Sequence, residues 1–140
     1  MRQFVIDASV AVKWYLPEPY SDKAEAVLAD SGALLAPDHL YLEVASVLWQ
    51  RGLRGEIDPA TAGQIVAELR KVPIELRHTT ELVTDALALA LESGCTLEDS
   101  LYLALAVQAS CPVVTADRRF HDALKGGPLG AHVLWIGDFV

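Results

Sequence analysis

The stretch that decides the fold is FVIDASVAVKWYL, residues 4–16. A short apolar run, typical of a buried strand, ends at Asp7 and leads into a segment with helical character, residues 11–16. Four more apolar runs follow at 33–36 (ALLA), 74–77 (IELR), 112–116 (PVVTA) and 132–136 (HVLWI). Together with residues 3–6 (QFVI), these runs predict the strands of a mostly parallel sheet.

Longer segments with helical spacing lie between the predicted strands. They are 22–30 after Ser21, 39–51 between Asp38 and Gly52, 60–71 after Asp58-Pro59, 81–93 between Thr79 or Thr80 and Gly94, 97–110 after Thr96, and 118–124 after Asp117. The flanking residues are common signals for the start and end of a helix. The alternation predicts an α/β fold with helices on both faces of the sheet. We expect residues 1–140 to form a single domain, with 125–130 as a loop.

Composition excludes several classes of protein. Of the 140 residues, 52% are hydrophobic and 21% are charged, which argues against a disordered or fibrous chain. No apolar run reaches the roughly 18 residues of a membrane span, and Asp7 interrupts the region where a secretion signal would be apolar. Cys95 and Cys111 form no CxxC pair, and the histidines lack zinc-ligand spacing. We expect a reduced, cytoplasmic protein with no membrane association.

Three aspartates stand at the start of predicted helices. Asp7 and Asp117 directly follow predicted strands, and ligands of open parallel sheets bind beyond the carboxyl ends of the strands. Both could instead be N-caps. Asp99 fits a capping box with Thr96, in which it would return a hydrogen bond to the Thr96 backbone. For each aspartate a functional role and a capping role are open.

A fourth acidic residue lies on a narrow polar stripe. His39, Glu43, Ser46 and Gln50 are spaced i, i+4, i+7 and i+11 on one predicted helix. The rest of that helix is apolar, so we expect it to be buried on most sides, with the stripe facing a cleft. The alternative is a stripe that faces bulk water.

The net charge of −8, from 19 acidic and 11 basic residues, argues against broad electrostatic capture of nucleic acid. It is compatible with an acidic surface for solubility or with carboxylates gathered around a cation. If the four acids converge, their mutual repulsion raises their pKa values, and a bound cation would offset this repulsion. Oxygen ligands favour Mg²⁺ or Mn²⁺, which can polarise a phosphodiester and activate water. Periodicity alone does not show that they converge.

Four motifs, each with one of these acids, resemble those of the PIN-domain family, and most closely its VapC-like toxin ribonucleases. They are IDASVAVKWYLPEP (6–19), PDHLYLEVASVLW (37–49), TLEDSLYLALAV (96–107) and VVTADRRFHDAL (113–124). The resemblance implies a three-layer sandwich with a mostly parallel central sheet. It also implies a Mg²⁺- or Mn²⁺-dependent endoribonuclease site in which Asp7, Glu43, Asp99 and Asp117 are the catalytic, metal-binding residues.

The same resemblance assigns supporting residues. The family often carries a small or hydroxylic residue where Ser9 and Thr115 stand. Thr115 lies two residues before Asp117, on the same strand face, and could hydrogen-bond a carboxylate or a metal-bound water. Apart from the resemblance, the charge of Arg118 and Arg119 could hold substrate phosphates, or the two side chains could simply be solvated. Asp122 could be an auxiliary acid, although a solvated helix residue is the simpler interpretation.

The implied partners are an RNA substrate, a second copy in a homodimer, and a cognate antitoxin of a toxin–antitoxin module. The antitoxin could dock on Trp14, Tyr15 or Leu16 if these are exposed, whereas a core role is the simpler expectation. An antitoxin arginine could also pair with the acids and displace the metal.

Two alternatives come from other classes. A phosphatase of the haloacid dehalogenase type expects a second aspartate two residues after the first, where this chain has Ser9. A receiver domain expects paired acids near the end of the first strand and a lysine after a late strand, and neither is evident. A non-catalytic PIN-like module that only binds a partner is the third interpretation.

Overall fold

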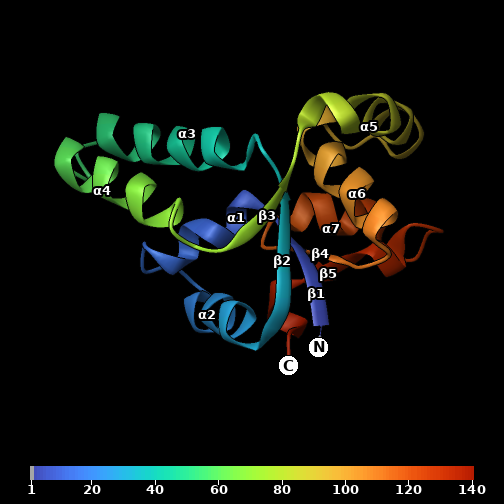
Figure 1. Cartoon of the computed structure of the whole chain (residues 1–140), viewed down its shortest axis with the longest axis horizontal. Helices are drawn as coiled ribbons and strands as arrows, with labels where there is room; N and C mark the ends of the chain where they lie inside the picture. The colour runs from blue at the N-terminus through green and yellow to red at the C-terminus, as the bar shows by residue number, and fades with distance from the viewer. Residues whose placement is uncertain (1) are drawn as a thin grey trace.

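The computed structural model describes residues 2–140, which contain a five-stranded sheet in which every pair of neighbouring strands is parallel (Figure 1). The strands are β1 (Arg2–Ile6), β2 (Ser31–Pro37), β3 (Ile74–Arg77), β4 (Val113–Thr115) and β5 (Val133–Trp135). Their spatial order is β3-β2-β1-β4-β5, so β1 is central and lies between β2 and β4. The predicted parallel sheet is confirmed, and the carboxyl ends of its strands share one edge.

Helices cover both sides of the sheet. They are α1 (Ala8–Ala11), α2 (Ser21–Asp30), α3 (Leu40–Leu53), α4 (Pro59–Leu69), α5 (Thr79–Ser93), α6 (Leu97–Ala109) and α7 (Arg118–Leu124), with short 3₁₀ turns η1 (Val12–Trp14), η2 (Gly130–His132) and η3 (Ile136–Asp138). In Figure 1, α1 to α4 lie to the left of β1 and β2, and α5 and α6 lie to their right. This arrangement confirms the expected α/β sandwich. Among residues 2–140, no helix has both the length and the apolar content needed to cross a bilayer.

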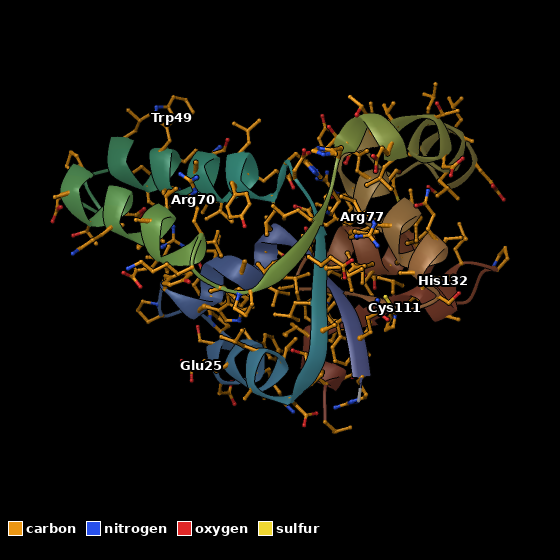
Figure 2. All side chains as sticks on the ribbon, viewed as in Figure 1. Glu25, Trp49, Arg70, Arg77, Cys111 and His132 are labelled. Carbon is orange, nitrogen blue, oxygen red and sulfur yellow. The ribbon has the colours of Figure 1, made fainter. Side chains whose placement is uncertain are left out.

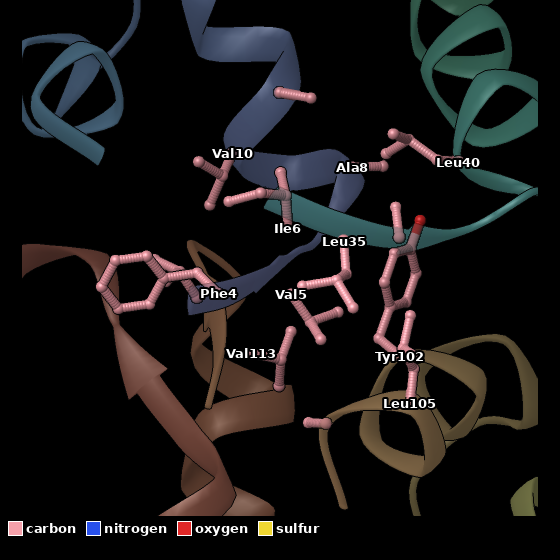
Figure 3. Packing of buried hydrophobic residues seen from close by; sticks show 14 of the residues in the cluster. Phe4, Val5, Ile6, Ala8, Val10, Leu35, Leu40, Tyr102, Leu105 and Val113 are labelled. Atoms are coloured by element: carbon pink, nitrogen blue, oxygen red, sulfur yellow. The ribbon is translucent and has the colours of Figure 1, made fainter. Parts of the chain in front are cut away.

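The core is densest around β1 and α6. All three apolar residues at the end of β1 are buried, and α6 buries every residue from Ser100 to Ala106 because it is covered by α5 on one side and the sheet on the other. Figure 3 shows the Tyr102 ring rising from α6 among these side chains, with its hydroxyl directed toward the region of Ala8 and Leu40. This side chain is fully buried, yet it carries a polar atom.

The first predicted helix differs from the structure in its bounds. Helical geometry begins at Ala8 rather than at residue 11, and it passes into the 3₁₀ turn η1 that ends at Trp14. A proline disfavours helical geometry in the residue that precedes it, so Pro17 and Pro19 prevent a longer helix here. Trp14, Tyr15 and Leu16 are partly buried and pack against the core, in agreement with the simpler expectation for these residues.

The expectation that the helix carrying Glu43 is buried on most sides is wrong. Only Leu40, Val44 and Leu48 of α3 are buried. Leu42 is 69% exposed, Trp49 63% and Leu53 70%, and Figure 2 shows Trp49 projecting outward from the helix. The reason is positional, because α3 packs against α1 and α4 with one face only and leaves the opposite apolar face uncovered.

Candidate active site

A pocket of about 340 Å³ opens at the carboxyl-terminal edge of the sheet. Its lining includes the four predicted acids, which are Asp7, Glu43, Asp99 and Asp117, together with Ser9, Ser46 and Gln50. The acids come from the end of β1, the first turn of α3, the start of α6 and the start of α7. Within the described chain, no basic side chain lines this pocket. Four carboxylates from distant parts of the sequence therefore share one solvent-accessible space.

Asp7 is the most deeply placed of the four acids, with 4% of its surface exposed. Its Oδ2 accepts hydrogen bonds from Thr115 Oγ1 at 2.7 Å and from Ser9 Oγ at 2.8 Å. Those hydroxyls accept in turn from backbone N–H groups, Thr115 Oγ1 from Asp117 at 3.0 Å and Ser9 Oγ from Ala116 at 2.9 Å. The Asp7 side chain makes no capping hydrogen bond to α1, so the capping interpretation is wrong for this residue.

The pKa of Asp7 is raised to about 7, mainly by burial and also by the nearby carboxylates of Asp99 and Glu43, although the two hydroxyl hydrogen bonds lower it. A carboxylate loses favourable hydration when it is buried, and a neighbouring negative charge disfavours its ionised form. Without a compensating cation, the ionised form of Asp7 is therefore held at a cost in stability.

Glu43 is held by an aromatic residue from another helix. The Tyr102 hydroxyl donates to Glu43 Oε1 at 2.6 Å, and His39 Nε2 lies 3.4 Å from the same oxygen. Burial, together with the negative charges of Asp7 and Glu43, raises the pKa of Tyr102 well above its ordinary value. The phenol is therefore a neutral donor. Of the predicted polar stripe, Glu43, Ser46 and Gln50 line the pocket, whereas His39 packs on the Tyr102 ring at a centroid distance of 4.8 Å.

Asp99 and Asp117 both stand at helix starts, but only Asp117 caps its helix with its side chain. Thr96 Oγ1 accepts from the Asp99 N–H at 3.1 Å, so Thr96 caps α6. The return bond of the predicted capping box, from the Thr96 N–H to the Asp99 carboxylate, is not among the hydrogen bonds of residues 2–140. Asp117 does cap α7, because its Oδ1 accepts from the Arg119 N–H at 3.0 Å. The pKa of Asp99 is raised to about 6, mainly by burial and also by the negative charges of Asp117 and Glu43.

The structure separates the two predicted arginines. The Arg118 guanidinium lies over the Trp135 ring, 3.9 Å from its centroid, which is a cation–π contact. Arg119 instead borders a recess of about 120 Å³ together with Thr96 and Asp99. Asp122 does not line the acidic pocket, and its carboxylate lies 3.1 Å from Lys125 Nζ on the exposed face of α7.

Sequence reasoning missed Tyr102 as a part of this site. It lies three residues after Asp99, on the same side of α6. A tyrosine inside an otherwise apolar helix needs a partner for its hydroxyl, and this was the available signal.

The chemistry of the donors suits a hard divalent cation. Among residues 2–140, no three His, Cys, Asp or Glu side chains are gathered closely enough to enclose a metal ion. Mg²⁺, however, is usually held by one or two carboxylates and several waters rather than by a cage of protein atoms. An open pocket with four carboxylates, two of them with raised pKa values caused partly by one another, fits such a cation.

Comparison with known proteins agrees with this architecture. Residues 4–125 match the PIN domain family. The chain is 33% identical to Ribonuclease VapC3 from Pyrobaculum aerophilum over 122 residues, which is 86% of this chain and 93% of that protein. The crystal structure of PAE2754 from Pyrobaculum aerophilum superposes with a TM-score of 0.72 at 20% identity, covering 97% of this chain and 85% of that one. A toxin–antitoxin complex from Klebsiella pneumoniae contains a chain with a TM-score of 0.64 at 14% identity, covering 94% and 95%.

The family match spans most of the chain, and the identity to a VapC protein extends over nearly all of that relative. The chain therefore belongs to the PIN-domain family and is VapC-like within it.

Proposed function

We propose that this protein is a metal-dependent endoribonuclease and the toxin of a toxin–antitoxin pair, which hydrolyses RNA phosphodiester bonds at Asp7, Glu43, Asp99 and Asp117. The observation that carries the proposal is the convergence of these four carboxylates in one pocket with no basic side chain among its lining residues in the described chain. The name of the relative Ribonuclease VapC3 supports the reaction class.

The four acids would bind Mg²⁺ or Mn²⁺. A cation bound there would polarise a phosphodiester and lower the pKa of an attacking water. Asp7 is fixed by the hydroxyls of Ser9 and Thr115, so its orientation is set before any ligand binds. The deep end of the pocket is therefore preorganised, which favours a reaction that depends on precise placement.

The substrate would approach from the side of Asp99 and Asp117, which are partly exposed, whereas Asp7 is buried. Arg119 borders the recess beside Asp99, where its guanidinium could hold an RNA phosphate. Arg118 is engaged with Trp135, which makes it the weaker candidate for this role. With a net charge of −8, the protein is a poor general RNA binder, so recognition would depend on few phosphate contacts.

We also propose a cognate antitoxin as partner, in line with the toxin–antitoxin complex among the structural neighbours. The half-buried Trp14, Tyr15 and Leu16 offer little surface for docking. An apolar pocket of about 410 Å³ between α3 and α4, bordered by Trp49 and Leu53, is better suited to receive an antitoxin segment. It shares α3 with the acidic pocket, where an arginine of the same segment could pair with the carboxylates.

A homodimer would be compatible with the exposed apolar face of α5. Val83, Leu87 and Leu91 are spaced four residues apart, and Leu91 is 80% exposed. Such a face on a stable helix is typical of a surface that contacts another protein.

The test is RNA cleavage by the purified protein with Mg²⁺, with Mn²⁺ and with EDTA. We expect cleavage only with a divalent cation, and a loss of at least about 100-fold in Asp7→Asn, which exceeds the usual effect of losing an outer-shell partner. Asp122→Asn is the matched control, because Asp122 lies outside the pocket, and it should cleave like the wild type. Added antitoxin should suppress the activity. Equal cleavage by Asp7→Asn and wild type, or cleavage that persists in EDTA, would contradict the proposal.

A further inference from the structure

The Tyr102 hydroxyl lies on the buried face of α6. Within the described chain, it is the one side-chain atom of that face that hydrogen-bonds a residue of the acidic pocket. The Tyr102 side chain has no exposed surface, and its ring packs among apolar residues (Figure 3). Phenylalanine would fill this space equally well. Burying a hydroxyl is unfavourable unless it is hydrogen-bonded, and this one is bonded to a pocket carboxylate at 2.6 Å.

This contact makes the two oxygens of Glu43 different. Oε1 accepts from Tyr102 and lies 3.4 Å from His39 Nε2. For Oε2, residues 2–140 supply no hydrogen bond and no ion pair. Glu43 is only partly buried, so without Tyr102 its flexible side chain could turn toward water.

The same contact joins two elements that carry acids. Glu43 is on α3 and Tyr102 is on α6, where Asp99 precedes Tyr102 by three residues. His39 also links α3 to α6, because its ring packs on Tyr102 and its Nε2 lies 3.2 Å from the Glu98 carbonyl oxygen. A displacement of Tyr102 would therefore disturb the position of Glu43 relative to Asp99.

We infer that Tyr102 is a positioning residue, whose hydroxyl fixes Glu43 through Oε1 and keeps Oε2 turned to the pocket for a divalent cation. The inference rests on the proposed metal-dependent function. Tyr102 itself contacts neither the cation nor the RNA in this role. Its removal should lower metal affinity by about 10- to 100-fold, as is typical when a ligand loses the partner that orients it.

The experiment is a calorimetric titration of Mn²⁺ into the RNA-free protein, with Tyr102→Phe compared with wild type. Tyr41→Phe is the matched control. Tyr41 is on α3, two residues before Glu43, but its hydroxyl makes no hydrogen bond among residues 2–140. We expect the Kd for Mn²⁺ to be about 10- to 100-fold higher in Tyr102→Phe and unchanged in Tyr41→Phe. Equal Mn²⁺ affinity in Tyr102→Phe and wild type would overturn the inference.

A double-mutant cycle separates positioning from a general structural effect. If Tyr102 acts through Glu43, then Tyr102→Phe should change the Mn²⁺ affinity little when Glu43 is already alanine. A full 10-fold loss in the Glu43→Ala background would overturn the inference, even if Tyr102→Phe alone behaves as expected. Wild-type protein that neither binds Mn²⁺ nor cleaves RNA would instead overturn the proposed function, and the inference with it. Wild-type binding that Asp7→Asn weakens but Tyr102→Phe does not would overturn the inference alone.

Discussion

The four acids of the pocket are held in two different ways. We call Asp7 and Glu43 the inner pair because distant parts of the core hold them, and Asp99 and Asp117 the outer pair. Asp7 and Glu43 receive hydroxyl hydrogen bonds from residues far away in the sequence, Thr115 and Tyr102. Asp99 and Asp117 stand at the first turns of helices, as Glu43 does, but within residues 2–140 no hydroxyl from a distant segment donates to their carboxylates, and the local backbone positions them. The inner pair depends on tertiary packing, whereas the outer pair depends mainly on helix starts. The inner pair is therefore expected to be rigid, and the outer pair better able to adjust to a substrate.

The largest expected effect concerns Asp99, where capping and function can be separated. Thr96 supplies the cap of α6, so Asp99→Asn should leave the fold intact and should not lower the melting temperature, because it removes repulsion from Asp117 and Glu43. RNA cleavage should fall by about 100-fold or more, beyond the usual effect of losing an outer-shell partner. Cleavage rates and thermal melts of the same preparations provide the check. Retained cleavage with a clearly lower melting temperature would mean that Asp99 is structural and that the site has three acids.

An intermediate effect is expected from pH, and Asp7 is its main source. The folded-state pKa of Asp7 is about 7, above the roughly 3.9 of an unfolded aspartate, so the folded protein binds more protons between these values. The stabilisation from protonated Asp7 is fully present below about pH 4 and is lost as pH rises through 7. In EDTA, the melting temperature should therefore fall by at least about 5 °C from pH 5 to pH 8.

Two comparisons sharpen this pH prediction. Asp7→Asn should show a clearly smaller fall over the same range, since its amide does not ionise, although Asp99, with a pKa of about 6, still contributes. Saturating Mn²⁺ should raise the melting temperature at pH 8 more than at pH 5, because binding competes with protonation. A pH dependence that is identical in Asp7→Asn and wild type would show that Asp7 is not the titrating group.

The smallest effect is expected from the outer pair's local support. Thr96→Ala removes the hydroxyl that accepts from the Asp99 N–H and should cost about 1 kcal/mol of stability. Cleavage should stay within a few-fold of wild type, since later turns of α6 are anchored in the core and hold the helix start in place. Chemical denaturation and the cleavage assay measure the two quantities. A loss of cleavage as large as that of Asp99→Asn would mean that the outer acids also need precise support.

Much of the fold could be predicted because its signals are local. Five apolar runs correspond to the five strands, and Thr96, Asp58 and Gly94 lie at the helix boundaries that their chemistry favours. The placement of Asp7 and Asp117 beyond strand ends followed from the same runs. The prediction that α3 is buried on most sides was wrong, because hydrophobicity along a helix does not show how many of its sides pack against a neighbour.

By itself, the sequence determined where strands and helices form and which acids stand at their ends, since hydrophobic periodicity and capping act over a few residues. Only the tertiary structure decided which elements become neighbours. The strand order places β4 beside β1, and this brings Thr115 within 2.7 Å of Asp7 across 108 residues of sequence. Packing of α6 against the sheet likewise brings Tyr102 to Glu43 across 59 residues. Such hydrogen bonds form only after the core has assembled, because their geometry depends on side chains that no local pattern brings together.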